Sequence, residues 1–319
     1  MSSINKPIRQ FIVDVFGVDM DIFVKALKMS PGSQGAIHGA ISELLYLAHC
    51  KSLGFEVFRI KEKPKGGFDS KSTEAKGDFY IRKNNWNKEM GLVIECKGIK
   101  TNAEKHAGYT DKDKLLEFLR KHSFKRKEKI TSNYKSGLKA YNKTKGTWES
   151  NNSGEFPDFR WDSNNPGPGI PDLTKVWKNE KDLKNWISGF SDSDFTENKY
   201  WDLKAPMRLV QTHMPNTRTD TETNIKSTGP LVNEFNILAI DLFLRTGIHE
   251  FVFANSLELN HQQNSPNHLQ QNYTIDILLE CENFAQHSLL SPWYNNLEEC
   301  IGKTSPELRK IDDTQLDYR

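Results

Sequence analysis

The chain has 319 residues, a length that suits one elaborated domain or two. Aromatic residues make up 11% of it, which is enough to build a sizeable core, so a wholly disordered chain is excluded. Its 44 Lys and Arg offset 42 Asp and Glu, and because the net charge is only +2 it indicates no class of partner. Any electrostatic signal must therefore come from where the charges lie.

No segment of the sequence has the pattern of an export signal or a membrane span. The longest strongly apolar stretch, Phe235–Leu244, is interrupted by Asn236 and Asp241 and is far shorter than the roughly 20 residues that cross a bilayer. The four cysteines lie far apart without a CxxC pair, which argues against a disulfide framework or a cysteine zinc site. We therefore expect a soluble, reduced protein of the cytoplasm.

Helical periodicity dominates the N-terminal region. Apolar residues recur at helical spacing in Asn5–Phe16 and Ile22–Leu27, and a longer helix is expected over Pro31–Cys50, with Gly54 just beyond its end. The apolar stripe predicted for this longer helix consists of Ile37, Ile41, Leu44, Leu45 and Ala48. Glu43 lies beside the stripe, so we expect it at the edge of a buried face.

The next region changes to the alternating pattern of strands. Strands are expected over Phe55–Ile60, Gly77–Arg82 and Gly91–Lys97, followed by a helix over Asp111–His122. The order helix, three strands, helix indicates a mixed α/β core.

The second half of the chain is also mixed. The segment Trp148–Asp172 is rich in Asn, Ser, Gly and Pro and is expected to be long and irregular. Beyond it, helices are expected over Asp182–Phe190 and Phe235–Arg245, and strands over Met207–His213, Glu250–Ala254 and Tyr273–Cys281. This half is either a second domain or the rest of one sheet.

The polar residues of the predicted strands carry the chemical signal. Because side chains alternate between the faces of a strand, Glu95 and Lys97 point to one face and their apolar neighbours to the other. Asp78 heads the preceding strand. If the two strands pair, two carboxylates and one ammonium group meet at one end of the sheet.

This combination suits metal-assisted hydrolysis of a phosphodiester. Mg²⁺ prefers oxygen ligands and typically takes one or two carboxylates together with water and substrate phosphate. A neighbouring Lys can stabilise the charge that develops on the phosphoryl oxygens, or help to deprotonate or position the attacking water.

Asp78 and the tripeptide Glu95-Cys96-Lys97, set in an apolar strand, make residues 31–122 resemble the PD-(D/E)xK nuclease superfamily, which includes most type II restriction endonucleases. The resemblance implies a central mixed sheet flanked by helices, with Asp78, Glu95 and Lys97 as catalytic residues. It also implies Mg²⁺ held by Asp78, Glu95 and Glu43, the last from the preceding helix. Gly77 stands where the superfamily often has Pro.

The activity implied by the resemblance is sequence-specific cleavage of double-stranded DNA by a homodimeric restriction enzyme. Residues 1–146 would then be the catalytic core with N-terminal helices, and residues 147–319 a mixed α/β extension that completes the sheet, recognises DNA, or does both. Two segments, Trp148–Asp172 and Thr217–Thr228, are candidates for base readout, because Asn and Gln can read adenine and Arg and Lys guanine.

A basic stretch follows the proposed catalytic strand. Residues 97–145 hold fifteen Lys or Arg against five Asp or Glu, which suits a polyanion held over the site. The densest part supplies the predicted DNA-binding residues Lys121, Lys125, Arg126 and Lys127. A solvated basic helix is the simpler interpretation of the same pattern.

Other interpretations of the carboxylates remain open at this stage. Pro171-Asp172 with Asp202-Leu203-Lys204 is a second match to the same motif, although no apolar strand leads into it. Glu95 and Lys97 can also form an ordinary surface ion pair. The alternative functions are a DNA-repair or mobile-element nuclease of the same fold and a non-catalytic nucleic-acid-binding protein.

Overall fold

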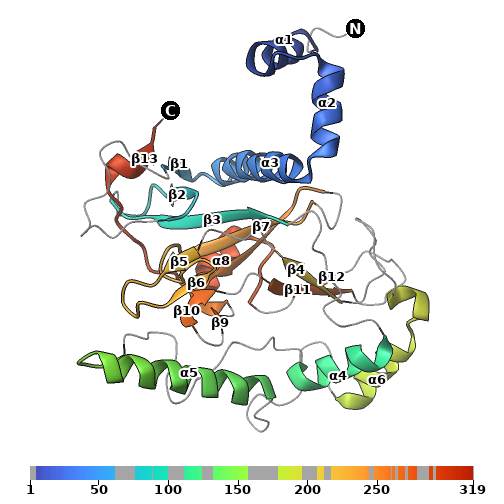
Figure 1. The fold of residues 1–319 in the computed structure, drawn as a ribbon, viewed down its shortest axis with the longest axis vertical. Coiled ribbons are helices and arrows are strands. Elements are labelled where there is room, and N and C mark those ends of the chain that lie inside the picture. The colour runs from blue at the N-terminus through green and yellow to red at the C-terminus, as the bar shows by residue number, and fades with distance from the viewer. Residues whose placement is uncertain are drawn as a thin grey trace.

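The computed structural model describes most of the chain. The described residues are 5–61, 76–87, 89–99, 111–123, 132–156, 179–195, 207–211, 217–243, 248–259, 261–262, 265–269, 272–278, 287–289 and 292–318. Within them the protein has a mixed α/β fold around a six-stranded sheet (Figure 1). No helix in these ranges is both long enough and apolar enough to cross a membrane.

The central sheet contains strands from both halves of the chain. Its members are β1 (Glu56–Ile60), β2 (Phe79–Arg82), β3 (Leu92–Gly98), β7 (Ile237–Asp241), β8 (Phe251–Asn255) and β13 (Leu316–Asp317). Their order is β13-β1-β2-β3-β7-β8, in which β3 and β7 run parallel and the other neighbours antiparallel. The region 147–319 therefore supplies three of the six strands.

The parallel pair of β3 and β7 is held by a buried asparagine just before β7. The Asn236 Oδ1 accepts the Val93 N–H at 2.8 Å, and the Asn236 N–H donates to the Val93 carbonyl at 2.8 Å. The side-chain amide also donates to the Glu307 carbonyl at 2.8 Å, which ties the C-terminal region to the same point.

The helix predicted over Phe235–Arg245 is wrong, because this stretch contains strand β7. All five residues of β7 are buried, since the strand lies inside the sheet with both faces covered. A short apolar run of this kind can form either a buried strand or a buried helix, and periodicity alone does not distinguish these two structures.

Helices surround the sheet and extend beyond it. They are α1 (Asn5–Phe16), α2 (Met20–Met29), α3 (Pro31–Ser52), α4 (Lys112–Ser123), α5 (Ser132–Asn151), α6 (Glu180–Ser188) and α8 (Leu297–Thr304), with 3-10 turns η1 (Asp192–Phe195), η2 (Ser256–Glu258) and η3 (Asp313–Gln315). Gly54, at φ +76°, follows the end of α3 as predicted. The first residues of the segment predicted to be irregular, Trp148–Asn151, instead belong to the last turn of α5.

Smaller sheets and a hairpin lie on the side of the central sheet away from α3. One sheet contains β4 (Met207–Gln211), β11 (Asn272–Leu278) and β12 (His287–Leu289), and a second pairs β9 (His261–Gln262) with β10 (Ser265–Leu269). The strands β5 (Thr217–Thr219) and β6 (Lys226–Thr228) form the hairpin. Figure 1 shows α5 running beyond these elements.

The face of α3 that packs on the sheet differs from the predicted one. Tyr46 and Cys50 are fully buried there, and the Ser42 hydroxyl donates to the buried Asp241 carboxylate at 2.6 Å. The predicted stripe is solvent-exposed, at 40% for Ile37, 37% for Ile41, 65% for Leu44 and 38% for Leu45. The predicted stripe and the packed face both recur at helical spacing. The face that packs on the strands is the one with the small residues Ser42 and Cys50 and the aromatic ring of Tyr46.

We predict that Asn236→Ala destabilises the protein by about 1–3 kcal/mol, because it leaves the buried Val93 N–H without a partner and removes the bond to the Glu307 carbonyl. Urea denaturation followed by circular dichroism measures the loss. The exposed Asn233→Ala is the matched control and should change the free energy of unfolding by less than about 0.5 kcal/mol. Equal stability of the two variants would contradict the role of Asn236.

Candidate active site

Three of the predicted residues meet on two adjacent strands. Asp78 lies just before β2, and Glu95 and Lys97 lie on β3, which pairs with β2. The Lys97 Nζ is 2.6 Å from Glu95 Oε1 and 3.4 Å from Asp78 Oδ2. One ammonium group therefore bridges two carboxylates, and we call these residues the Asp78–Glu95–Lys97 cluster.

The backbone of β3 fixes the position of Asp78. The Asp78 N–H donates to the Ile94 carbonyl at 2.8 Å, and its Oδ2 accepts the Cys96 N–H at 2.8 Å. A Cβ added to Gly77 would lie 2.5 Å from Val93 Cγ1 and 2.7 Å from the Ile94 carbonyl oxygen. Glycine is required at this position because the chain approaches β3 so closely, and Pro, which also carries a Cβ, would meet the same contact.

Alternation along β3 separates the polar residues from the apolar ones as predicted. Ile94 and Cys96 join the apolar cluster beneath α3, whereas Val93 belongs to the cluster on the opposite face of the sheet. Glu95 and Lys97 share that opposite face with Val93. Glu95 is buried, while the side chain of Lys97 stays 25% exposed, so the cluster opens to solvent at one end.

Burial and charge act together on the ionisation of the cluster. Burial raises the pKa of Glu95 to about 8, and the nearby charge of Asp78 adds to this rise while Lys97 opposes it. Burial alone would lower the pKa of Lys97, but Glu95 and Asp78 raise it above its ordinary value. Lys97 therefore stays protonated, and two carboxylates compete for one positive charge. A cation added at this point would relieve that competition.

Glu43 lies apart from the cluster. It is on α3, and its side chain forms an ion pair with Arg59 of β1. Across the described ranges, no three Asp, Glu, His or Cys side chains lie close enough together to hold a metal ion. Glu43 thus does not complete a three-ligand group with Asp78 and Glu95 in this arrangement.

A further carboxylate near the cluster was not predicted. Glu234 is 4% exposed, and its charge contributes to the raised pKa of Glu95. Its Oε1 lies 3.4 Å from Arg218 Nε and 3.6 Å from Lys76 Nζ, which brings two basic side chains to the same side of the sheet. The feature of the sequence that could have indicated Glu234 is an acidic residue within an apolar run, directly before the buried strand β7.

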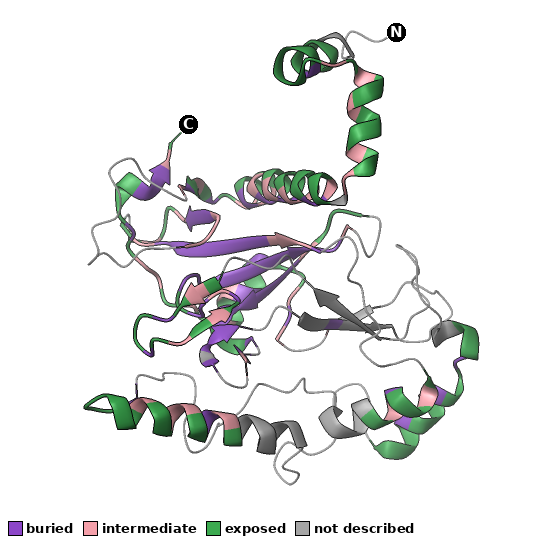
Figure 2. Cartoon of the chain, viewed as in Figure 1, coloured by how far each residue is buried: buried purple, intermediate pink, exposed green. Residues whose placement is uncertain are grey.

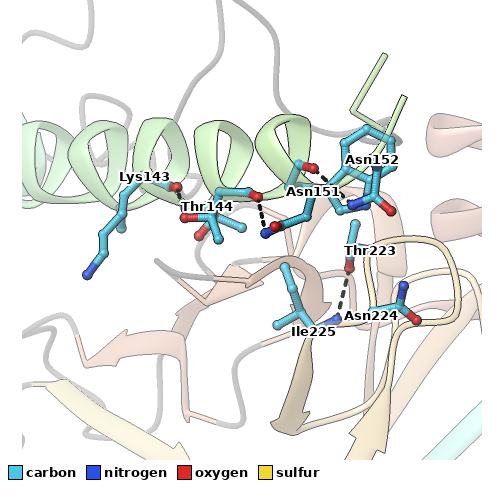
Figure 3. Close-up of a pocket in the computed structure, with 10 residues that line it drawn as sticks. Lys143, Thr144, Asn151, Asn152, Thr223, Asn224 and Ile225 are labelled. Atoms are coloured by element: carbon cyan, nitrogen blue, oxygen red, sulfur yellow. Dashed lines mark hydrogen bonds between the residues drawn. The ribbon is translucent and has the colours of Figure 1, made fainter. Parts of the chain in front are cut away.

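A pocket with several polar side chains lies between the C-terminal part of α5 and the turn of the β5–β6 hairpin (Figure 3). Its volume is about 750 Å³. It is lined by Ala140, Lys143, Thr144, Thr147, Trp148, Asn151, Asn152, Thr223, Asn224 and Ile225. The described start of one segment predicted to read bases, with Trp148, Asn151 and Asn152, thus faces residues 223–225 of the other across the pocket.

Several polar atoms of the pocket lining remain available to a ligand. The Asn151 and Asn152 amides donate to the Thr147 and Trp148 carbonyls, an arrangement that leaves both side-chain oxygens to accept. The buried indole N–H of Trp148 has no hydrogen-bond partner among the described residues.

The β5–β6 hairpin connects the pocket with the ion pair of Arg218 and Glu234. Arg218, near Glu95 through Glu234, starts the hairpin, and Thr223 at its turn lines the pocket. Five residues of extended chain span at most about 17 Å.

The predicted DNA-binding residues and the competing carboxylate set lie largely outside the described part of the chain. Lys121 lies in α4, and its side chain is not among those described. Lys125, Arg126 and Lys127 lie outside the described residues, as does the competing set of Asp172, Asp202 and Lys204.

Comparison of the chain with protein-family models, with curated proteins and with solved structures found no match.

The raised pKa of Glu95 predicts a specific pH dependence of stability. The folded chain holds this proton more tightly than the unfolded chain, in which the pKa is near 4.5, so stability falls as the pH rises from there through about 8. Glu95→Gln removes the titration. We expect the free energy of unfolding of the wild type to fall, relative to Glu95→Gln, by at least about 1.4 kcal/mol over this window.

Chemical denaturation at several pH values, without divalent ions, measures this difference. Asp78→Asn is an internal check, because removing its charge should lower the pKa of Glu95 and reduce the fall. Parallel pH profiles for the wild type and Glu95→Gln would show that burial does not raise this pKa.

Proposed function

We propose that the protein is a Mg²⁺-dependent, sequence-specific endodeoxyribonuclease of the cytoplasm that hydrolyses phosphodiester bonds in double-stranded DNA, as type II restriction enzymes do. The observation that carries the proposal is the Asp78–Glu95–Lys97 cluster on the adjacent strands β2 and β3. Buried cysteines without disulfides at positions 50, 96 and 300 are in keeping with a reducing compartment.

The topology around the cluster supports a PD-(D/E)xK core. Helix α3 precedes three antiparallel strands, β1, β2 and β3, and a later strand, β7, returns parallel to β3. This arrangement is a central mixed sheet with a helix against one face.

The donor set fits a hard divalent ion. Asp78 and Glu95 would hold Mg²⁺, which prefers one or two carboxylates and keeps its remaining positions for water and phosphate. The bound ion would supply Lewis-acid stabilisation of the phosphoryl oxygens and a more acidic water. Glu43, paired with Arg59, lies outside this set.

Lys97 has an electrostatic role in this proposal. Its pKa is raised by Glu95 and Asp78, so it carries a positive charge at neutral pH and is a poor general base. Its ammonium group is placed to stabilise negative charge on a phosphate next to the two carboxylates.

The pocket between α5 and the hairpin supports a role in DNA recognition. Amide side chains read adenine in the major groove, and Asn151, Asn152 and Asn224 offer such groups on facing elements.

We predict that Lys97→Ala lowers the rate of plasmid cleavage by about 10²–10³, because one electrostatic stabiliser of the transition state is lost. Asp78→Asn should abolish cleavage, because a metal ligand is lost. The affinity for the duplex, measured by fluorescence anisotropy in Ca²⁺, should stay within a few-fold of wild type for both variants.

The exposed Lys310→Ala is the matched control for Lys97 and should cleave at the wild-type rate. Cleavage by Asp78→Asn at the wild-type rate would remove the cluster from the mechanism and favour the set of Asp172, Asp202 and Lys204. Nicking or smearing of the plasmid by the wild type would indicate a repair-type nuclease instead. Binding without cleavage in any divalent ion would indicate a non-catalytic protein.

We predict that the double variant Asn151→Ala, Asn224→Ala loses sequence discrimination while the cluster stays intact. Each lost amide contact should reduce discrimination between sites by about 1–3 kcal/mol, which is roughly 5- to 150-fold in relative rate. Sequencing of the fragment ends from a plasmid digest measures it. The exposed Asn142→Ala on α5 does not line the pocket and should cut at the wild-type positions. An unchanged fragment pattern in the double variant would place base readout elsewhere.

A further inference from the structure

Exposed apolar side chains are concentrated in the first three helices. Of the fifteen large hydrophobic residues exposed in the described part of the chain, twelve lie on α1, α2 and α3. They are Ile8, Phe11, Val13, Val15, Phe16, Ile22, Val24, Met29, Ile37, Ile41, Leu44 and Leu45. Figure 2 shows these helices largely in the colour of exposed residues, in contrast to the buried sheet.

Helices α1 and α2 form an arm that projects away from the sheet (Figure 1). Helix α2 buries no residue at all, and on α1 the large apolar residue that is buried is Ile12. The two helices have 12 and 10 residues, and isolated helices shorter than about 12–15 residues are marginal in water. Among the described residues, the arm therefore lacks the packing that normally stabilises such helices.

The exposed apolar area of the three helices is large enough to form a protein interface. Twelve large apolar side chains, each about half exposed, together present on the order of 1,000 Å². Each partner in a standard protein interface buries about 800 Å².

The arm and α3 carry apolar stripes of matching length. On α1, Ile8, Phe11 and Val15 lie along one face, and the outer stripe of α3 runs from Ile37 to Leu45. The two stripes cover eight and nine residues, or about 10–12 Å of helix axis each. A two-fold axis would place the stripe of α1 on the stripe of α3 twice, once for each protomer.

We propose that a second copy of this chain covers these helices, with the arm of each protomer packed against the outer stripe of α3 on its partner. Both surfaces of the contact are present on one chain, so a symmetric dimer buries all of them without any other partner. A lipid surface fits less well, because membrane-binding helices carry an excess of basic residues. On the arm, Lys6, Arg9, Lys25 and Lys28 are nearly balanced by Asp14, Asp19 and Asp21.

Sedimentation velocity of the full chain over a range of concentrations tests the proposal. The wild type should be a dimer, and Phe11→Asp on α1 and Leu44→Asp on α3 should each weaken it by at least about 30-fold, as loss of an interface hot spot does. Both side chains are exposed, at 59% and 65%, so each variant should fold normally as judged by its circular dichroism spectrum. The control is Ile248→Asp, equally exposed at 67% but far along the chain, which should leave the dimer intact.

Cross-linking identifies which surfaces meet. Phe11→Cys and Leu44→Cys chains carrying different tags are mixed and treated with a short bismaleimide, with the wild type as the background control. The proposal expects the main product to join the two different variants. A monomer at all concentrations, a dimer that survives Leu44→Asp, or products that join only like variants would each overturn it. The inactive Asp78→Asn chain should dimerise as the wild type does, so the result stands apart from the proposed nuclease function.

Discussion

The parallel pairing of β3 and β7 is the constraint on which the rest of the structure depends. It joins two segments separated by more than a hundred residues, and parallel strands are never joined by a tight turn. Asn236 supplies the local fixation, since it engages Val93 from both its backbone and its side chain. With β3 fixed between β2 and β7, Glu95 and Lys97 have a defined face of the sheet to occupy.

The polar cluster on that face is costly to maintain without a purpose. Two carboxylates lie within reach of one ammonium group, and one of them, Glu95, is buried enough that its pKa is raised. A strand flanked by apolar clusters on both faces would be more stable with apolar residues at these positions. Electrostatic strain in a partly open position is typical of sites that bind a cation or a charged substrate.

Local sequence patterns were sufficient to predict the Asp78–Glu95–Lys97 cluster. Strand alternation placed Glu95 and Lys97 on one face, and the short connection from β2 to β3 brought Asp78 beside them, so the cluster follows from residues 78–97 alone. Glu234 and Arg218 reach the same face through β7 and the β5–β6 hairpin, and no local pattern reports a contact across that distance.

Two errors in prediction have one physical origin. Strand β7 was read as a helix, and the outer stripe of α3 was read as the core face, because apolar periodicity shows that a surface is to be buried but not what covers it. For β7 the cover is the interior of the sheet. For α3, no other part of the described chain covers the outer stripe. The wrong prediction therefore points to a surface whose apolar pattern is that of a buried face.

Helix α3 packs on the sheet through Tyr46 and Cys50 and through the hydrogen bond from Ser42 to Asp241. Helices α1 and α2 contribute almost no buried residues to that core. Local opening costs free energy in proportion to the contacts that break, so α3 can separate from the strands only when the sheet itself opens. The arm can detach with little loss to the fold. It is therefore the part of the chain that can be exchanged between molecules while the strands that carry Asp78, Glu95 and Lys97 stay undisturbed.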